Sequence, residues 1–320
     1  MKGLKVLVTG ASGFVGEAVV FRLLLDRKLT PVAAVRGSSR LGGLCRVVPF
    51  SLGNNTRLPV LDDVQVVIHC AARVHVMNES ATDALMEFRK INVDGTVSLA
   101  RKAAESGVKR FIYISSIKVN GESTVPGNPF KFDDPPAPID PYGISKLEAE
   151  DALRKISLDT DMEVVIIRPP LVYGPGVRAN FLSMMSWLNK RVPLPLGAIN
   201  NRRSFVAVDN LVDLVIKCVD HPEAANNTFL VSDGEDLSTT QLLQCIGRAF
   251  AKPALLIPVP VWMLKSVLSV LGKKVIAQRL FDSLEVDIVR TQTLLSWSPP
   301  VAMTRALRQT ADHYLDTLKK

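Results

Sequence analysis

The sequence has few cysteines and few aromatic residues. Among its 320 residues the only cysteines are Cys45, Cys70, Cys218 and Cys245, and Phe, Trp and Tyr together make up 6%. The cysteines are far apart and form neither a CxxC pair nor a Cys/His cluster, so neither a disulfide framework nor a zinc site is indicated. We therefore expect no metal centre, and a reducing, cytoplasmic environment suits the chain best.

Long apolar runs are also missing. The run near the N-terminus is too short for a signal peptide and lacks a small-residue cleavage site. The most apolar later stretch, residues 253–271, contains Pro258, Pro260 and Lys265, and so falls short of the ~20 uninterrupted apolar residues that span a bilayer. Helical spacing in this stretch favours packing beneath a second lobe over contact with a membrane surface. The residues with that spacing are Trp262, Leu264, Val267, Leu268 and Leu271.

The sequence also lacks long runs of residues with the same charge. Lys and Arg total 39 against 31 Asp and Glu, which gives a net charge of +8. No run of about five or six like charges occurs. The excess favours anionic partners in general, but basic and aromatic residues do not interleave, so nucleic acid is not indicated as a partner.

Short β-branched runs alternate with longer amphipathic segments. The runs lie at residues 5–9, 31–35, 45–50, 64–70, 110–115 and 162–168. Such runs are typical of buried parallel strands, and their alternation with helices predicts an α/β fold with a Rossmann-type doubly wound sheet. Frequent prolines after Arg168 mark a smaller C-terminal lobe. We expect residues 1–170 to form the sheet domain, residues 205–232 to return to it, and residues 171–320 to form the second lobe.

A glycine-rich turn follows the first of these strands. Thr9-Gly10-Ala11-Ser12-Gly13-Phe14-Val15-Gly16 leads directly from strand into helix. The glycines permit a tight turn and the close approach of a pyrophosphate, while free backbone N–H groups at the helix start face the anion. This pattern predicts a dinucleotide site with contacts from Gly10, Ser12, Gly13, Phe14, Val15 and Gly16.

The end of the second strand bears on which dinucleotide binds. An NAD-binding chain is expected to carry an acidic residue about 20 residues past the glycines, but this sequence has Arg36 there. A guanidinium can hold the 2′-phosphate of NADP with two hydrogen bonds, and Arg40 is a second candidate contact. We expect NADP(H) to be preferred, with NAD(H) as the alternative. Ala71 and Ala72 are small residues that would leave space for the cofactor at the end of the fourth strand.

Four polar side chains have the chemistry of a proton-transfer site. Tyr142 and Lys146 are four residues apart, on one face of the helix expected after Pro141. A free tyrosine has a pKa of ~10, and a nearby ammonium lowers that pKa, which would make Tyr142 a usable acid or base. Ser115 and Ser116 end the fifth strand, where a hydroxyl can hydrogen-bond a substrate oxygen.

Together these motifs resemble the short-chain dehydrogenase/reductase superfamily, in its extended branch of nucleotide-sugar enzymes. The resemblance covers nearly the whole chain and rests on TGASGFVG, HCAA, INVDGT, YISS, YGISK, RPPLVYGP and RSFVAV. It implies a nicotinamide that exchanges hydride, Tyr142 as the acid or base, and Lys146 on the nicotinamide ribose. It also implies that Ser116, rather than Ser115, is the catalytic hydroxyl.

The resemblance implies partners as well. Asn180 and Arg203 match positions that hold the diphosphate of a nucleotide sugar in the second lobe, and Ser116 and Lys118 are further candidate substrate contacts. Asn92 resembles a buried asparagine on the helix through which members of the family form dimers. We therefore expect a nucleotide-sugar substrate and a homodimer.

Departures from the family pattern narrow the chemistry. Sugar dehydratases carry an Asp-Glu pair after the catalytic hydroxyl, whereas this chain has Ile117-Lys118, so dehydration is not expected. Arg36 stands where epimerases usually have an acidic residue, and Leu171 stands where many UDP-sugar enzymes have an asparagine. Our leading hypothesis is NADPH-dependent reduction of a 4-keto nucleotide sugar, of the UDP-4-keto-6-deoxy-N-acetylhexosamine type, for surface polysaccharide.

Three alternatives stay open. The first is a UDP-hexose or UDP-N-acetylhexosamine 4-epimerase that uses the same residues. The second is a steroid-type alcohol dehydrogenase, favoured by the apolar segment at residues 253–271. The third is a non-catalytic NADP-sensing regulator, which would not need the intact Ser116, Tyr142 and Lys146. The sequence does not identify the sugar or its C4 configuration, which residues 74–81 and the second lobe are expected to decide.

Overall fold

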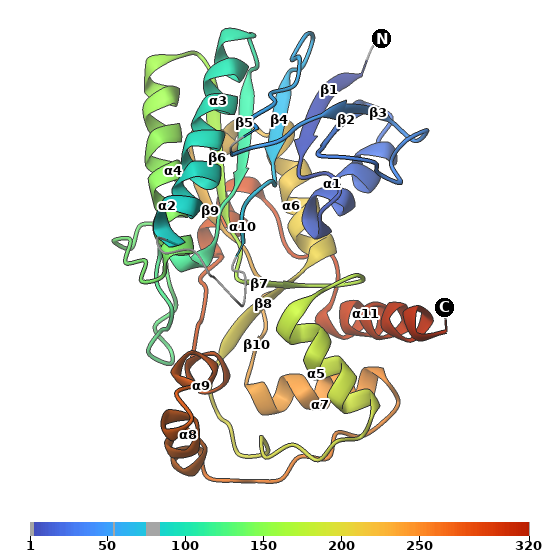
Figure 1. The fold of residues 1–320 in the computed structure, drawn as a ribbon, viewed down its shortest axis with the longest axis vertical. Coiled ribbons are helices and arrows are strands. Elements are labelled where there is room, and N and C mark those ends of the chain that lie inside the picture. Colours follow the sequence, from blue (N-terminus) through green and yellow to red (C-terminus); the bar gives the residue numbers. More distant parts are fainter. Residues whose placement is uncertain (1–2, 54, 75–83, 320) are drawn as a thin grey trace.

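A parallel sheet with helices on both faces forms the larger part of the molecule (Figure 1). The computed structural model describes residues 3–53, 55–74 and 84–319. The seven strands of the sheet are, in spatial order, β3 (Arg46–Pro49), β2 (Leu29–Val35), β1 (Leu4–Thr9), β4 (Val66–His69), β5 (Arg110–Ile114), β6 (Glu163–Arg168) and β9 (Thr228–Leu230). The Rossmann-type fold and the six strands expected from the sequence are confirmed, with their ends shifted by two residues at most.

The order of the strands places a crevice next to β1. From β1 the chain runs outward through β2 to β3, and then restarts on the other side of β1 with β4. Val8 pairs with Ala33 of β2 on one side and with Ile68 of β4 on the other. Connections that leave in opposite directions open a crevice beyond the carboxyl ends of the two strands, where open α/β sheets bind their ligands.

Both faces of the sheet are covered because successive residues of its strands point to opposite sides. Val6 and Val8 belong to the apolar core beneath α1 (Phe14–Leu24) and α6 (Val208–Asp220). Leu7 belongs to the core on the other face. That second face packs against α3 (Gly95–Glu105) and α4 (Pro141–Asp159), while α2 (Ala84–Arg89) and the π-helical segment η1 (Lys90–Asp94) lead into α3. Burial on both faces explains the nearly continuous apolar strands.

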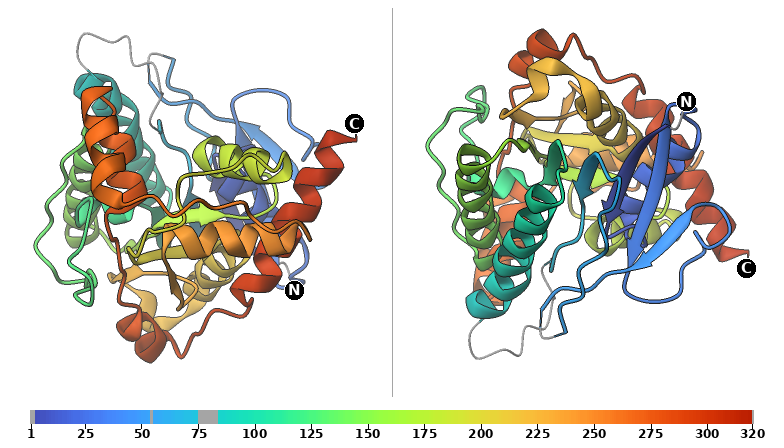
Figure 2. Two further views of the ribbon diagram at one scale, coloured as in Figure 1. Left: turned by 90° about the horizontal axis from the view of Figure 1, so that it is seen from below. Right: turned by 90° about the horizontal axis from the view of Figure 1, so that it is seen from above.

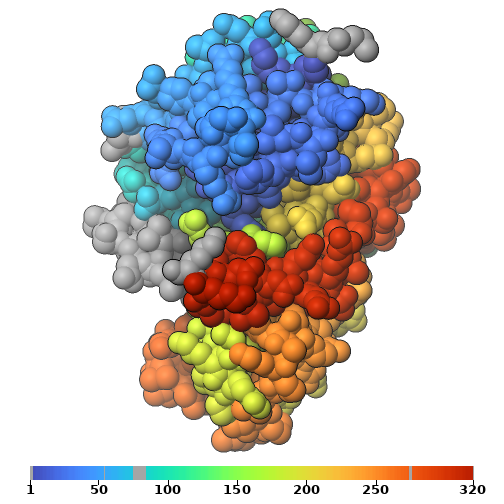
Figure 3. Space-filling model, turned by 90° about the vertical axis from the view of Figure 1, so that its right-hand side faces the viewer, coloured from blue at the N-terminus to red at the C-terminus, as the bar shows by residue number. Residues whose placement is uncertain are grey.

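A second, smaller lobe lies below the carboxyl ends of the strands in Figure 1. It contains a three-stranded sheet of β10 (Asp236–Leu237), β8 (Arg203–Ala207) and β7 (Leu171–Tyr173). Its helices are α5 (Ala179–Asn189), α7 (Thr239–Ala249), α8 (Val261–Val270), α9 (Lys274–Phe281) and α11 (Met303–Leu318). The remaining elements are two short 3-10 helices and a helix that packs on the large sheet: η2 (Ile117–Val119), η3 (Pro222–Ala224) and α10 (Val289–Leu295). Figures 2 and 3 show α11 running along the boundary between the lobes.

The chain returns to the large sheet in a different way from that expected. β8 pairs with β7 and β10 and not with the strands of the large sheet. β9 is a strand of the large sheet, and α6 packs on one of its faces. The alternation of β8 explains this, because Val206 packs in the core of the large sheet whereas Phe205 and Ala207 pack in the core of the small lobe. Trp297, just after α10, also packs on the large sheet, a second return that the sequence did not indicate.

The apolar helix in the small lobe is only partly packed. Leu264 and Leu268 contact the core of that lobe as expected. The same prediction is wrong for Trp262, Val267 and Leu271, which are 70%, 57% and 59% exposed. The helix lies at the edge of the lobe, so only one of its sides has a neighbour. Over the described parts of the chain, no helix is long and apolar enough to cross a bilayer.

Candidate active site

The glycine-rich turn lies at the crevice beside β1, and two of its glycines have no room for a side chain. Gly10 has a φ of +63°, and a Cβ on it would lie 2.8 Å from the Ala71 nitrogen. A Cβ on Gly16 would lie 2.2 Å from the Gly10 oxygen. α1 therefore starts directly against the turn, with its first N–H groups toward the crevice, an arrangement that suits a pyrophosphate.

A buried histidine holds the strand ends on either side of the crevice. His69 Nδ1 lies 2.6 Å from Thr9 Oγ1, and His69 Nε2 lies 3.0 Å from Thr96 Oγ1. Thr9 Oγ1 also accepts a hydrogen bond from the Ala71 nitrogen at 3.3 Å. Burial, aided by the positive charge of Lys146, lowers the pKa of His69 to about 3, so the ring is neutral. The sequence did not single out His69, whose role here is to join β1, β4 and α3.

A hollow of about 440 Å³ opens beside the turn. The predicted cofactor contacts that line it are Gly10, Ser12, Gly13, Arg36, Ala71 and Ala72. Phe50 and Ile91 add apolar surface, and Arg178 reaches the same hollow from the loop between β7 and α5. Small residues, helix N–H groups and arginines fit the phosphates and ribose of a dinucleotide. Arg178 was missed by the sequence reasoning, since only the fold brings this loop opposite the glycine turn.

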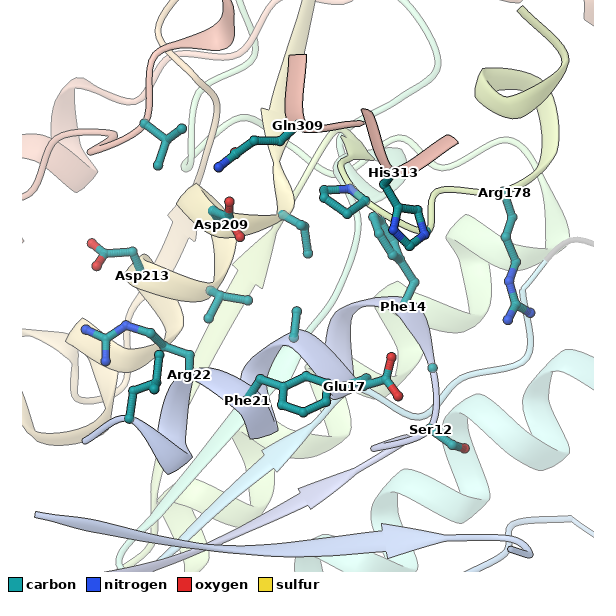
Figure 4. A pocket seen from close by; sticks show the side chains of 18 of the residues that line it. Ser12, Phe14, Glu17, Phe21, Arg22, Arg178, Asp209, Asp213, Gln309 and His313 are labelled. Carbon is teal, nitrogen blue, oxygen red and sulfur yellow. The ribbon is translucent and has the colours of Figure 1, made fainter. Parts of the chain in front are cut away.

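Arg40 lies outside this hollow. Its Nε donates to Glu17 Oε1 at 2.5 Å, and its guanidinium lies 5.7 Å from the centre of the Phe21 ring. It lines an adjoining groove of about 780 Å³ between α1, α6 and α11, which shares Ser12, Gly13 and Arg178 with the hollow. Figure 4 shows this groove, with Phe14 and Glu17 on the side of α1. Of the two arginines expected at the cofactor, the structure thus brings only Arg36 into the dinucleotide hollow.

The candidate catalytic side chains meet at the carboxyl end of β5. The Tyr142 phenol lies close enough to the Ser116 hydroxyl for the serine to lower its pKa. Ser116 also accepts from the Lys118 nitrogen at 3.3 Å, which caps η2. Ser115 points elsewhere, because its Oγ donates to the buried Glu150 at 2.5 Å. The structure therefore brings Ser116, and not Ser115, to the tyrosine.

Local sequence explains why Tyr142 is held at this point. Pro141 begins α4, and the Asp140 side chain accepts from the Gly143 nitrogen at 2.7 Å, which caps the helix. A Cβ on Gly143 would lie 2.9 Å from the Lys118 oxygen, so only glycine lets α4 approach η2 so closely. The tyrosine ring packs edge-on against Phe88, with ring centres 6.1 Å apart.

Lys146 is buried one helical turn beyond the tyrosine. Its Nζ donates to the Ile114 oxygen at 2.8 Å and lies 4.4 Å from the centre of the Tyr113 ring. Burial lowers the pKa of Lys146 to about 8, against the attraction of Glu150 and Cys70, which raises it. Cys70, which acts on the charge of Lys146, lines the dinucleotide hollow.

The expectation that the ammonium makes Tyr142 acidic is wrong for the chain as it stands. Burial raises the pKa of Tyr142, the charge of Asp140 raises it further, and the nearby Ser116 hydroxyl lowers it. Lys146 Nζ is 5.9 Å from the centre of the Tyr142 ring, and its charge does not contribute to this shift.

A buried ion pair fixes the helix that carries these residues. Glu150 and Arg168 are both buried, and Arg168 Nη2 donates to Glu150 Oε2 at 2.6 Å. Arg168 also donates to Asn120 Oδ1 at 2.9 Å, while Ser115 donates to Glu150. The network joins α4 to the ends of β5 and β6. Neither charge was singled out from the sequence, where an isolated Glu on a helix gives no sign of burial.

Asn92 joins the catalytic helix to the edge of the dinucleotide hollow. Its side chain accepts from the Arg73 nitrogen at 2.8 Å and donates to the Arg73 oxygen and to Ser145 Oγ, each at 3.0 Å. Ser145 Oγ in turn donates to the backbone carbonyl oxygen of Tyr142 at 2.8 Å. Asn92 lies in the π-helical segment η1, an irregularity that often marks functional sites.

The expected substrate contacts are more dispersed. Lys118 Nζ donates to Glu122 Oε1 at 2.9 Å and also to Asp140, so its charge is balanced by two carboxylates. Arg203 begins β8 and donates to the Asp282 oxygen at 2.8 Å. Asn180 is exposed in the first turn of α5. Of the segment expected to select the sugar, residues 75–81 lie outside the described residues.

Comparison with known proteins shows which family this chain belongs to. Residues 6–232 match the NAD dependent epimerase/dehydratase family. A UDP-glucose 4-epimerase of Vibrio cholerae is 47% identical over 313 residues, which are 97% of this chain and 95% of that protein. The chain belongs to the NAD dependent epimerase/dehydratase family, and within it this chain is similar over almost its full length to a nucleotide-sugar enzyme.

Solved structures agree on the fold. The UDP-glucuronic acid 4-epimerase of Bacillus cereus in complex with NAD has a TM-score of 0.79 at 22% identity, covering 99% of this chain and 100% of the other. The UDP-glucose 4-epimerase of Thermotoga maritima with UDP-glucose has a TM-score of 0.77 at 21% identity, covering 98% and 100%. At these identities the likeness concerns the fold alone.

The contact between Gly16 and Gly10 leads to a first prediction. In Gly16→Ala the new Cβ would meet the Gly10 oxygen at 2.2 Å, so the turn must shift. Overpacking of this kind costs about 1–3 kcal/mol, which corresponds to a loss of roughly 5- to 150-fold in dinucleotide affinity. Equilibrium dialysis with NAD(P) measures it. Gly42→Ala is the matched control, because its Cβ would lie 3.4 Å from the nearest atom, and an equal loss in that variant would contradict the argument.

Proposed function

We propose that this chain is a 4-epimerase of UDP-hexoses that uses a tightly held nicotinamide dinucleotide. The main support is that Ser116, Tyr142 and buried Lys146 come together at the carboxyl end of β5. The 47% identity to a UDP-glucose 4-epimerase over nearly the whole chain points to the same activity. This is the alternative weighed above, and it takes precedence over the reductase hypothesis.

The side chains suit proton transfer at a sugar hydroxyl. When bound, the nicotinamide would take the C4 hydrogen as hydride and return it to either face of the sugar ring. Tyr142 would accept the proton of the C4 hydroxyl and give it back to the same oxygen, so no net oxidation results. Ser116 would hold that oxygen through a hydrogen bond, and the positive charge of Lys146 would stabilise the phenolate. Arg203, in the second lobe, would contact the diphosphate.

The products test this function directly. Purified protein is incubated with UDP-glucose and, separately, with UDP-N-acetylglucosamine, and the 4-epimers are separated by chromatography. We expect product to form with no net consumption of NADH or NADPH. Failure to form either 4-epimer, with or without added dinucleotide, would refute the proposal.

Reduction of a 4-keto nucleotide sugar remains a second candidate because of Arg36. This arginine lines the hollow and is exposed at the end of β2, where a carboxylate would exclude the 2′-phosphate of NADP. An exchangeable NADPH is what a reductase needs. With a UDP-4-keto-6-deoxy-N-acetylhexosamine as substrate, a reductase would consume one NADPH for each product molecule, whereas an epimerase would consume none.

The role of Arg36 gives a prediction about cofactor choice. A hydrogen bond to a charged group contributes about 1.5–3 kcal/mol, so Arg36→Ala is expected to weaken NADP binding by roughly ten- to a hundredfold and to leave NAD binding unchanged. Calorimetric titration measures both affinities. Arg40→Ala is the control, since Arg40 pairs with Glu17 outside the hollow. A wild-type protein that binds NAD more tightly than NADP would rule out this role.

The pKa of Lys146 gives a prediction about pH. Because burial lowers this pKa to about 8, the ammonium is present below that pH and is lost as the pH rises through it. If the ammonium supports the phenolate, kcat should fall on the alkaline side with an apparent pKa near 8. Lys146→Arg, whose charge does not titrate in this range, should move the decline to higher pH. An unchanged alkaline limb in that variant would assign the limb to another group.

We also propose that the chain forms a homodimer through α3 and α4. These helices lie side by side, and the groove of about 450 Å³ between them is lined in part by Val97, Ala104 and Ile156. Such a face suits helices from a second copy. Sedimentation equilibrium at micromolar concentration checks the mass.

A further inference from the structure

The small lobe carries apolar side chains that its own core does not use. On α8, Trp262, Met263, Val267 and Val270 are 70%, 44%, 57% and 89% exposed, and Leu271, which follows the helix, is 59% exposed. Figure 1 places α8 and α9 at the end of the molecule farthest from the seven-stranded sheet. Figure 2, left, shows α8 from below along its whole length. We call this group of five residues the α8 patch.

Most of the α8 patch points away from the packed residues. With about 3.6 residues per turn, Leu264 and Leu268 share one side, which contacts the core of the small lobe. Trp262, Met263 and Val270 fall on the far side, Val267 lies between the two sides, and Leu271 follows the helix on the packed side. A helix that is apolar on both sides is normally buried on both. Within the described residues only one side of α8 is covered, so we infer that the exposed apolar side binds a partner.

The charge around the patch indicates the kind of partner. From residue 237 to residue 281 the chain has no Asp or Glu, but it has six basic residues. These residues are Arg248, Lys252, Lys265, Lys273, Lys274 and Arg279. The helix α5 also has no acidic residue and is followed by exposed Lys190 and Arg191. The small lobe therefore combines an exposed apolar helix with an excess of positive charge, in which Lys265 alone of the α8 residues is paired, with Asp282 at the end of α9.

We propose that the α8 patch docks on the surface of an anionic phospholipid bilayer. An amphipathic helix with Trp, Val and Leu on one side and nearby lysines is suited to lie in the interface between headgroups and acyl chains. α8 has 10 residues, too few to span the bilayer, so it lies along the surface. Lys265 and Lys273 are exposed close to the patch. Lys265 also pairs with Asp282 at 3.1 Å, so the attraction to the negative headgroups, which salt screens, is assigned chiefly to Lys273.

A second copy of the chain fits the patch less well. In a two-fold dimer the same surface meets itself, so two surfaces that each carry an excess of positive charge would be brought together. Like charges across an interface oppose binding. The bilayer supplies the opposite charge, whereas a second α8 patch does not. The proposed site of dimerisation on α3 and α4 belongs to the large domain and leaves the α8 patch available.

Flotation with lipid vesicles tests the proposal on the full-length protein. Vesicles of phosphatidylcholine alone are compared with vesicles of equal parts phosphatidylcholine and phosphatidylglycerol, at low and at high salt. We expect the protein to float with the mixed vesicles at low salt, and to stay in solution with phosphatidylcholine alone or at high salt. Failure to float with the mixed vesicles would overturn the proposal, and so would equal flotation with both kinds of vesicle.

Paired variants locate the contact. Trp262→Ser with Val270→Ser is expected to reduce the floated fraction by about tenfold, because both side chains reach into the interface. Leu25→Ser is the matched control, since Leu25 is also 80% exposed but lies after α1 in the large domain. All three positions are exposed, so folding should be retained, as thermal melting verifies. Unchanged flotation of the double variant would overturn the proposal. A fall in its sedimentation mass would also do so, since that would place the patch between two copies.

Discussion

Replacing Tyr142 with phenylalanine is expected to lower kcat by about 10²- to 10⁴-fold while leaving dinucleotide binding intact. The substitution removes only the phenol hydroxyl, which lies near the Ser116 hydroxyl. The ring can keep its edge-on contact with Phe88, so the start of α4 should not move. Because a phenyl group neither accepts nor donates a proton, the C4 hydroxyl would have to lose its proton to water.

Steady-state epimerase assays and dinucleotide titration on the same preparation check this result. The control is Tyr314→Phe, the same change in a buried tyrosine of α11, which should alter kcat by less than about twofold because Tyr314 packs against Phe250 in the core of the small lobe. Turnover that survives in Tyr142→Phe would remove the tyrosine from the catalytic role. It would also reopen the alternative of a chain that binds the dinucleotide without using it.

The sequence predicted which candidate catalytic side chains come together, because their spacing is local. Tyr142 and Lys146 are four residues apart, so any helix brings them to one side. The glycine turn directly follows a strand, and a parallel sheet places all carboxyl strand ends on one edge. Ser116 reaches the same edge from β5. Spacing within one element and the order of elements were therefore sufficient for this part of the site.

Contacts between distant segments could not be predicted in the same way. Arg36 and Arg40 are equally good candidates in the sequence. In the structure Arg40 pairs with Glu17 of α1, which lies more than 20 residues earlier in the chain, and so it does not reach the dinucleotide hollow. The pKa of Tyr142 depends on how deeply the ring is buried and on the position of Asp140, which spacing does not contain. Arg178 reaches the dinucleotide hollow only because β7 places its loop against the large domain.

The exposed side of α8 shows a related limit. Apolar residues at helical spacing indicate that a helix is amphipathic, but they do not say how many of its sides meet the rest of the chain. Leu264 and Leu268 pack against the core of the small lobe, whereas Trp262 and Val267 are exposed. The number of neighbours is a property of where the helix lies in the fold.

The second large effect is expected at the buried ion pair behind the catalytic helix. Glu150→Gln is expected to destabilise the protein by about 3–5 kcal/mol, because it leaves the buried Arg168 guanidinium without its counter-charge. Arg168→Met should destabilise by a similar amount for the complementary reason. In the double variant both charges are gone, so we expect part of the stability to return, and a double-mutant cycle from urea unfolding measures the coupling.

Glu148→Gln, on the same helix, is the control for this ion pair. Glu148 pairs with Arg89 at the surface, where an ion pair contributes only about 0–1 kcal/mol. Comparable destabilisation in both glutamine variants would show that the position of Glu150 in the core has no special importance.

The same variant tests whether the ion pair also acts on the chemistry. The negative charge of Glu150 raises the pKa of Lys146, which burial otherwise lowers. Without that charge the ammonium should be lost at lower pH, so the alkaline limb of the pH profile in Glu150→Gln should move below its wild-type position. Glu148→Gln should leave the limb in place. A limb that stays unchanged in Glu150→Gln, in protein shown by its melting curve to be folded at the assay temperature, would reduce the ion pair to a purely structural element. A shifted limb would mean that the group fixing α4 also keeps its lysine charged.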